Sequence, residues 1–161
     1  MITQSTVEQE LLKWMQEFVE APHPSLGNWP PCPYARQARL SNNILIKPGA
    51  DPYYDSMSLL TYDWSKEAVV FWYNQIDPTI FVAQVELANK SLLDKNIVVL
   101  EDHPDTEEVV SNIKMNFGFC PIIVGQQLNK LNTAADQLRS KGYYDTWSQS
   151  DLDKIVTWRY K

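Results

Sequence analysis

The stretch Ala68-Val69-Val70-Phe71-Trp72-Tyr73 decides the fold of this 161-residue chain. It is β-branched and aromatic, so it predicts a strand that is buried on both faces and central in its sheet. Asp77-Pro78 follows and predicts the start of a helix, with Asp77 as the N-cap and Pro78 in the first turn. A second apolar run, Ile97-Val98-Val99-Leu100, predicts the next strand. We expect this strand–helix–strand unit to be a parallel, right-handed crossover.

Other elements are predicted on both sides of this unit, from the spacing of apolar residues and from helix-end signals. The predicted helices cover residues 5–21, 105–113, 128–141 and 150–158. Further strands are predicted over residues 40–46 and 121–124, whereas residues 51–63 fit either a short helix or an irregular aromatic-rich crossing.

Four short strands with flanking helices are typical of an α+β fold. The order of elements favours a two-layer sandwich of the ferredoxin-like type, and a small three-layer α/β sheet is the alternative. The length of the chain and the absence of internal repeats predict a single domain over residues 1–161.

The charge balance restricts the classes of partner. The chain has 20 acidic and 14 basic residues, a formal net charge of −6. A basic surface is needed to displace counterions from nucleic acid and to dock on anionic lipid, so neither partner is expected. No apolar run spans a bilayer and no signal peptide is visible, so we expect a soluble, cytoplasmic protein. The two cysteines fit a reducing compartment, with a single Cys32–Cys120 bridge as the alternative.

The most unusual segment is a proline-rich block over residues 22–36, which holds five of the ten prolines. Prolines fix the path of a loop, and a rigid loop can hold reactive groups in place. Cys32 lies between two prolines in this block, and a nearby cation could lower the pKa of its thiol. We therefore predict Cys32 as a catalytic thiol. The alternative is that Cys32 is a small buried apolar residue.

Three neighbours of this thiol complete the predicted site. Arg36 and Arg39 are close to it in the sequence and are predicted to hold an anionic group of the substrate. Tyr34 is predicted to line the wall of the pocket.

A second candidate lies in Glu101-Asp102-His103-Pro104-Asp105, at the carboxyl end of a predicted strand, where ligands gather in sheets with crossover helices. His103 could act as a general acid or base. Alternatively, His103 is a loop residue exposed to solvent, followed by a turn-forming Pro104 and by Asp105 as a helix cap. Together with His23 and a carboxylate of Glu101 or Asp102, it could also form a two-histidine, one-carboxylate metal site.

Two aromatic groups could line a pocket for a planar or apolar ligand, or could simply cover the sheet. Their members are Tyr53, Tyr54, Tyr62 and Trp64 in the first group, and Tyr143, Tyr144, Trp147 and Trp158 in the second.

The order of these motifs resembles an uncharacterised bacterial family. That family has a helix, a Cys-Pro-Phe-Ala signature, a strand–helix unit and a later His-Pro-Asp turn. The corresponding residues are Cys32-Pro33-Tyr34-Ala35 and His103-Pro104-Asp105, within residues 11–105, and Tyr34 replaces the phenylalanine. The function of the family is unknown, so the resemblance implies no reaction. It implies that the thiol loop and the His-Pro-Asp turn belong to one site.

Three functional hypotheses follow. The first is a small enzyme or small-molecule-binding protein with a pocket between the proline block and the His103 turn, in which Cys32 and His103 form the reactive pair. The second is a non-catalytic module that binds a protein partner through exposed aromatic side chains. The third is a metal-dependent enzyme that uses His23 and His103. The sequence identifies no cofactor.

Overall fold

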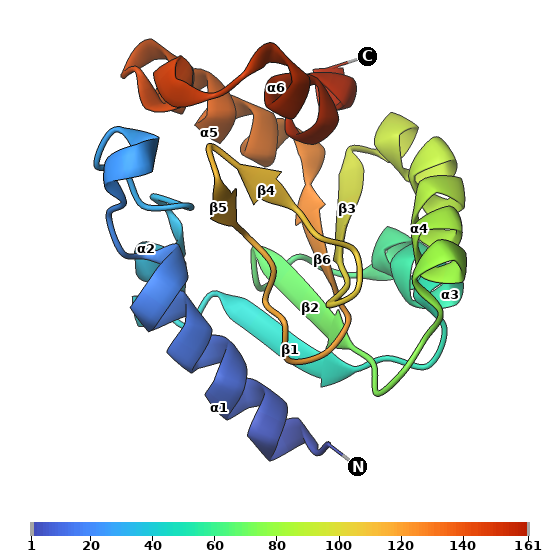
Figure 1. Ribbon diagram of the computed structural model, residues 1–161. Coiled ribbons are helices and arrows are strands. Elements are labelled where there is room, and N and C mark those ends of the chain that lie inside the picture. Colours follow the sequence, from blue (N-terminus) through green and yellow to red (C-terminus); the bar gives the residue numbers. More distant parts are fainter. Residues whose placement is uncertain (1, 161) are drawn as a thin grey trace.

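The computed structural model describes residues 2–160 and contains a mixed four-stranded sheet with the strand order β1-β2-β6-β3 (Figure 1). The strands are β1 (Ile44–Pro48), β2 (Ala68–Trp72), β3 (Ile97–Asp102) and β6 (Ile122–Gln127). β1 is parallel to β2, whereas β6 is antiparallel to both of its neighbours. The prediction that β2 is an inner strand is confirmed.

Helices surround the sheet. The α-helices are α1 (Gln4–Trp14), α2 (Ala35–Leu40), α3 (Pro52–Met57), α4 (Pro78–Leu92), α5 (Leu128–Ser140) and α6 (Gln149–Ile155). A π-helical turn, Met15–Val19, extends α1. Short 3₁₀ turns cover Pro24–Leu26, Ser58–Thr61, Leu93–Lys95, Tyr143–Thr146 and Thr157–Tyr160. None of the helices within residues 2–160 combines the length and the apolar character that a membrane crossing requires.

The β2–α4–β3 unit forms largely as its sequence predicts. Asp77 caps α4 by accepting hydrogen bonds from the N–H groups of Thr79 and Ile80, at 2.9 and 3.1 Å, and Pro78 is the first helical residue. β2 and β3 run in the same direction, but β6 lies between them. This split β–α–β arrangement is a feature of ferredoxin-like folds.

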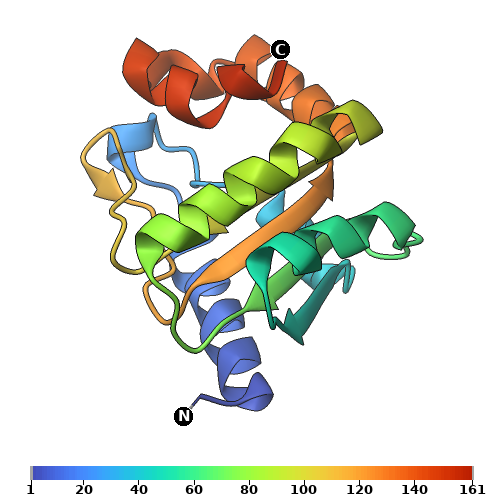
Figure 2. The same ribbon diagram turned by 90° about the vertical axis from the view of Figure 1, so that its right-hand side faces the viewer.

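Helices cover both faces of the sheet (Figures 1 and 2). On one face, α3 and α4 pack on a core that includes Val69, Phe71 and Ile123. On the other face, α1 packs on a core that includes Val70 and Ile122. α5 and α6 lie across one end of the sheet. The predicted α+β fold, a four-stranded sheet with packed helices, is confirmed, and α1 adds helical cover on the second face.

The predicted helix over residues 105–113 is wrong. This segment contains a β-hairpin of β4 (Val109–Val110) and β5 (Ile113–Lys114). The two turn residues, Ser111 and Asn112, have φ values of 50° and 67°. Positive φ at both central positions gives the tight turn whose twist matches antiparallel strands.

The predicted strand over residues 40–46 begins later than expected. Leu40 is the last residue of α2, and β1 starts at Ile44. Asn42, with φ of 53°, turns the chain between the two elements.

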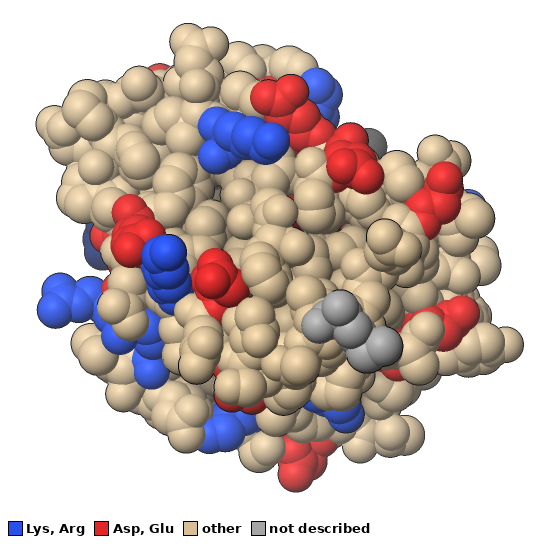
Figure 3. All heavy atoms as spheres, turned by 60° about the horizontal axis from the view of Figure 1, so that its bottom comes forward, with Lys and Arg blue, Asp and Glu red and all other residues tan. Residues whose placement is uncertain are grey.

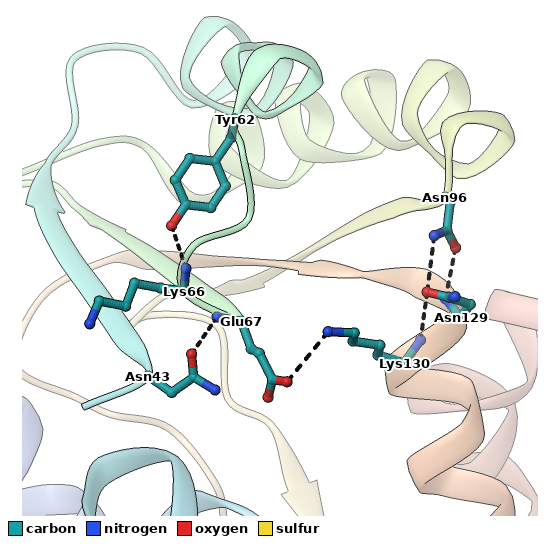
Figure 4. Close-up of polar contacts among 7 residues, drawn as sticks. All are labelled: Asn43, Tyr62, Lys66, Glu67, Asn96, Asn129 and Lys130. Carbon is teal, nitrogen blue, oxygen red and sulfur yellow. Dashed lines mark hydrogen bonds and ion pairs between the residues drawn. The ribbon is translucent and has the colours of Figure 1, made fainter. Parts of the chain in front are cut away.

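The end of the sheet next to the N-terminus of α5 is held by side-chain amides (Figure 4). Asn96 donates from Nδ2 to Oδ1 of Asn129 at 2.9 Å, and the Asn129 N–H donates back to Asn96 at 2.8 Å. The Glu67 N–H donates to Oδ1 of Asn43 at 2.9 Å. These bonds connect the starts of β3 and α5, and the loops before β1 and β2.

Charged side chains are interspersed on the face shown in Figure 3, where lysines and arginines alternate with acidic residues and much of the surface is uncharged.

Candidate functional site

A cleft of about 1010 Å³ lies along the edge of the sheet formed by β3. Its walls come from α4, the ends of β3 and β6, the β4–β5 hairpin, α6 and the proline block. Segments that are far apart in the sequence therefore meet around one cavity.

Aromatic side chains form part of the cleft wall. These are Trp14, Phe18, Trp147 and Trp158. The rings of Trp14 and Phe18 are stacked with their centroids 6.0 Å apart. Trp147 packs edge-on against Tyr144 at 5.0 Å. The indole Nε1 of Trp147 is buried and has no hydrogen-bond partner within residues 2–160.

Negative charge dominates the polar part of the cleft. The acidic residues that line it are Glu86, Glu101, Asp102, Glu107, Glu108, Asp151 and Asp153. Lys90 and Lys154 are the basic residues in the same lining. The cleft lining has seven acidic and two basic residues. This ratio of acidic to basic residues is higher than that of the whole chain, which has 20 acidic and 14 basic residues.

Three of these acidic residues lie at or near the carboxyl end of β3: Glu101, Asp102 and Glu108. Asp102 pairs with Ile122 and lies on the sheet face that α1 covers, whereas Glu101 pairs with Ile123 and lies on the face that α4 covers. Glu108 precedes the hairpin.

Asn116 holds this region together and is only 8% exposed. Its Oδ1 accepts from the Glu108 N–H at 2.8 Å, and its Nδ2 donates to the carbonyls of His103 and Thr106 at 3.1 and 2.9 Å. The Asp102 carboxylate accepts hydrogen bonds from Asn116 Nδ2 at 3.3 Å and from the Phe117 N–H at 3.1 Å.

Burial raises the pKa values of all three carboxylates, and repulsion by neighbouring carboxylates adds to the effect at Glu108 and Glu101. Desolvation, followed by the charges of Asp102 and Glu101, raises the pKa of Glu108 to about 7. Desolvation and the Asp102 charge raise the pKa of Glu101 as well. The pKa of Asp102 is also raised by desolvation, although its hydrogen bonds act in the opposite direction. The site thus concentrates negative charge that water solvates poorly.

Cys32 is an exposed residue and lines this cleft. Atoms packed around its sulfur desolvate the thiol and raise its pKa, and hydrogen bonds from the Tyr34 and Ala35 backbone offset this only in part. The expected lowering of the thiol pKa by Arg36 and Arg39 is therefore not found.

The two arginines instead lie near Glu20. Arg39 donates two hydrogen bonds to its carboxylate, at 2.7 and 2.9 Å, and this ion pair lowers the pKa of Glu20. Arg36 is exposed and adds a weaker attraction to Glu20. The Tyr34 hydroxyl donates to Gln137 on α5 at 3.2 Å. Cys32 is thus the one member of the predicted thiol group among the residues that line the cleft.

His103 is 4% exposed, and both of its ring nitrogens have partners. Nε2 lies 2.7 Å from the Ile76 carbonyl, and Nδ1 accepts the Asp105 N–H at 3.0 Å. A neutral ring with its hydrogen on Nε2 satisfies both contacts. The ring also packs edge-on against Phe81 at 5.6 Å. The His103 ring is therefore a buried part of the turn that bonds its backbone. The alternative, an exposed loop residue, is wrong.

His103 lines a second, shallower cavity of about 450 Å³, together with Asp77 and Cys120. Cys32 lines the larger cleft, so the predicted reactive pair is divided between two cavities. Both cysteines are free.

The structure brings no metal-ligand set together within residues 2–160. His23 packs against Phe18, with ring centroids 5.1 Å apart, and its Nε2 is buried and finds no hydrogen-bond partner among the described residues. The predicted combination of His23, His103 and a carboxylate of Glu101 or Asp102 therefore gains no support.

The sequence interpretation missed the roles of Glu108 and Asn116. Glu108 lies in the segment that the sequence predicts to be a helix over residues 105–113, and Asn116 lies just beyond it. The one available signal was the adjacent pair Glu101-Asp102 at a strand end.

Comparison with known proteins adds no further constraint, so the resemblance to the bacterial family stays a prediction. No protein-family model, curated protein or solved structure matches this chain.

Proposed function

We propose that this protein binds a positively charged, partly apolar small molecule in the cleft along β3. One observation carries the proposal: an aromatic and aliphatic cavity of about 1010 Å³ has seven carboxylates and two lysines in its lining. Ligand pockets for small molecules are mostly apolar, with a few polar groups that set orientation, and measure roughly 300–1,000 Å³. The cleft is at the upper end of this range.

The charge of the ligand follows from the carboxylates at the end of β3. Desolvation raises the pKa values of Glu108 and Glu101, and repulsion adds to it: the charges of Asp102 and Glu101 act on Glu108, and the charge of Asp102 acts on Glu101. A cation bound beside Glu108 would offset the negative charges of Asp102 and Glu101 and replace the solvation that the Glu108 carboxylate loses.

The apolar part of the ligand follows from the aromatic wall. Trp14, Phe18, Trp147 and Trp158 offer flat apolar surface near the acidic groups. The face of a tryptophan also attracts a cation, more strongly where water is excluded. An aryl- or alkylammonium ion combines the two properties.

Binding is preferred over catalysis because Cys32 and His103 line different cavities. In addition, the two hydrogen bonds of the His103 ring occupy the nitrogens that a general base would need. Cys32 would then be a contact at the rim of the cleft.

The test is isothermal titration calorimetry with matched ligands, supported by quenching of tryptophan fluorescence. Phenethylamine and benzyltrimethylammonium are expected to bind, whereas the neutral phenethyl alcohol and the anionic phenylacetate are not. Glu108→Gln should weaken amine binding by about tenfold, equivalent to roughly 1.4 kcal/mol.

Glu67→Gln is the control, because it removes one acidic charge on an exposed side chain that pairs with Lys130 outside the cleft. It should leave the affinity unchanged. Equal binding of the amine and the alcohol, or equal effects of the two substitutions, would contradict the proposal.

A further inference from the structure

The two edge strands of the sheet, β1 and β3, each have backbone N–H and C=O groups that point away from the sheet. An open edge of this kind is a template on which another chain can add a strand. Folded proteins therefore need a means of closing it, and here side chains do so at both edges.

At the β3 edge, the outward groups belong to alternate residues. In the antiparallel ladder with β6, Val99 lies opposite Gly125. The Val99 N–H and C=O are both bonded to a side chain of α4, so they do not bond β6. Val99 and Gly125 are therefore a non-hydrogen-bonded pair, and the Val99 backbone groups point away from β6.

That side chain is Asn89, which is 8% exposed. Its Nδ2 donates to the Val99 carbonyl at 2.9 Å, and its Oδ1 accepts the Val99 N–H at 2.9 Å. One carboxamide therefore makes the two hydrogen bonds that a residue of an added strand would make.

Asn89 is a polar exception on α4. The other buried residues of this helix are apolar: Phe81, Val85, Ala88 and Leu92. Burial of an amide costs free energy unless its hydrogen bonds are made, so an apolar residue would suffice here if packing were the only requirement. The two hydrogen bonds to the Val99 backbone explain why a polar amide occupies this buried position.

The β1 edge is closed by other means. Gln4 on α1 donates from Nε2 to the Ile46 carbonyl at 2.7 Å, while its Oε1 accepts from the Trp72 indole at 2.6 Å. Pro48 is two residues further along β1, on the same outward side, and has no N–H to offer.

We propose that Asn89 blocks the β3 edge and thereby prevents a second copy of this chain from pairing there. A two-fold pairing centred on Val99 would place Glu101 of one copy opposite Ile97 of the other. No like charges would then face each other directly, so charge does not prevent this pairing. The amide of Asn89 occupies the backbone groups at its centre.

Size-exclusion chromatography with light scattering tests this proposal over a range of protein concentrations. The unchanged chain should remain a monomer. Asn89→Ala should open the edge, so that the mass rises toward twice the monomer value with concentration. Lys90→Ala, an exposed neighbour on the same helix, is the control and should remain a monomer.

A second substitution identifies the edge that is used. Glu101→Pro removes the next outward N–H on β3 without removing a bond to β6, so Asn89→Ala combined with Glu101→Pro should return to the monomer. Asn89→Leu replaces the amide with an apolar side chain of similar size, leaves the Val99 backbone groups without these bonds, and should also dimerise. Folded variants at position 89 that stay monomeric would overturn the proposal. So would loss of the fold in both variants, because Asn89 would then be a requirement of folding.

Discussion

At the scale of single residues, several side chains stabilise the fold by hydrogen bonding to backbone groups. His103 was predicted as a catalytic group, but its ring bonds the Ile76 carbonyl and the Asp105 N–H while it packs on Phe81. Its position at a strand end near a cavity, which suggested catalysis, is equally the position of a turn that needs internal hydrogen bonds.

His103→Ala should therefore lower the free energy of unfolding by about 2–4 kcal/mol, because two part-buried hydrogen bonds to the backbone are lost and a ring-sized space is left in a buried position. Urea unfolding followed by fluorescence measures this change. Arg36→Ala, on an exposed residue, is the control. A change below about 0.5 kcal/mol, typical of a surface site, would show that the ring has no structural role.

Gly125 is a second residue whose identity follows from contact. A Cβ at this position of β6 would overlap the side chain of Leu59, which is 2% exposed. Gly125→Ala should destabilise the protein by about 1–3 kcal/mol through overpacking. Combination with Leu59→Ala should restore part of this loss, which thermal unfolding of the single and double variants would reveal. Fully additive effects would exclude the contact as the cause.

At the scale of elements, the β4–β5 hairpin depends on one buried amide. Asn116 bonds both strand-end and loop backbone, and the Met115 N–H extends the pairing by donating to the Glu108 carbonyl at 2.8 Å. The hairpin tip is held separately, since the Ser111 hydroxyl donates to the Thr146 carbonyl at 2.9 Å.

Asn116→Ala should loosen this hairpin before it affects the sheet. Hydrogen exchange of residues 103–116 should become at least about tenfold faster, which corresponds to roughly 1.4 kcal/mol, while β2 keeps its protection. Asn112→Gly is the matched control, because glycine accepts the φ of 67° at the turn. Uniform acceleration across the whole chain would mean that the hairpin opens only with global unfolding.

At the scale of the whole molecule, the carboxylates at the end of β3 couple stability to pH. Glu108 has a pKa of about 7 in the folded chain, against an ordinary value of 4.5. Between these values the folded state keeps a proton that the unfolded chain has released, so stability falls as the pH rises from about 4.5 to about 7.

Glu108→Gln should remove most of this dependence. The variant should be about 1–3 kcal/mol more stable than the unchanged chain at a pH above 7, and nearly equal to it near pH 4.5. Urea unfolding across this pH range provides the measurement, with Glu107→Gln as the neighbouring control. An unchanged slope in the Glu108 variant would show that another group causes the dependence.

Sequence patterns predicted the parts of the fold that depend on local signals. β2 and α4 are defined by apolar runs and by the Asp77-Pro78 start, and both formed as expected. The insertion of β6 between β2 and β3 depends on pairing between distant segments, which no local pattern contains. The hairpin was missed because Ser111-Asn112 lacks the glycine of the usual turn signal and Asp105 with Glu108 matches a helix cap.

The candidate site was less predictable than the fold. Cys32 and the Glu101-Asp102 pair were located in advance, and both line the cleft. Their association with Trp147 and Trp158 depends on how the C-terminal segment crosses the end of the sheet. The predicted pairing of Cys32 with His103 is not seen, since the two residues line different cavities. The His103 imidazole is instead bonded to the backbone carbonyl of Ile76.

The π-helical turn at Met15–Val19 has a consequence for how the cleft could change. Its Glu20 N–H bonds the Met15 carbonyl at 2.9 Å, five residues back, so the turn accommodates one residue more than an α-helical turn would. Deletion of a single residue there would restore ordinary α-helical winding and change the direction in which the Phe18 side chain leaves the helix. The position of Phe18 in the cleft wall, next to Trp14, thus depends on the number of residues in this turn as well as on their identity.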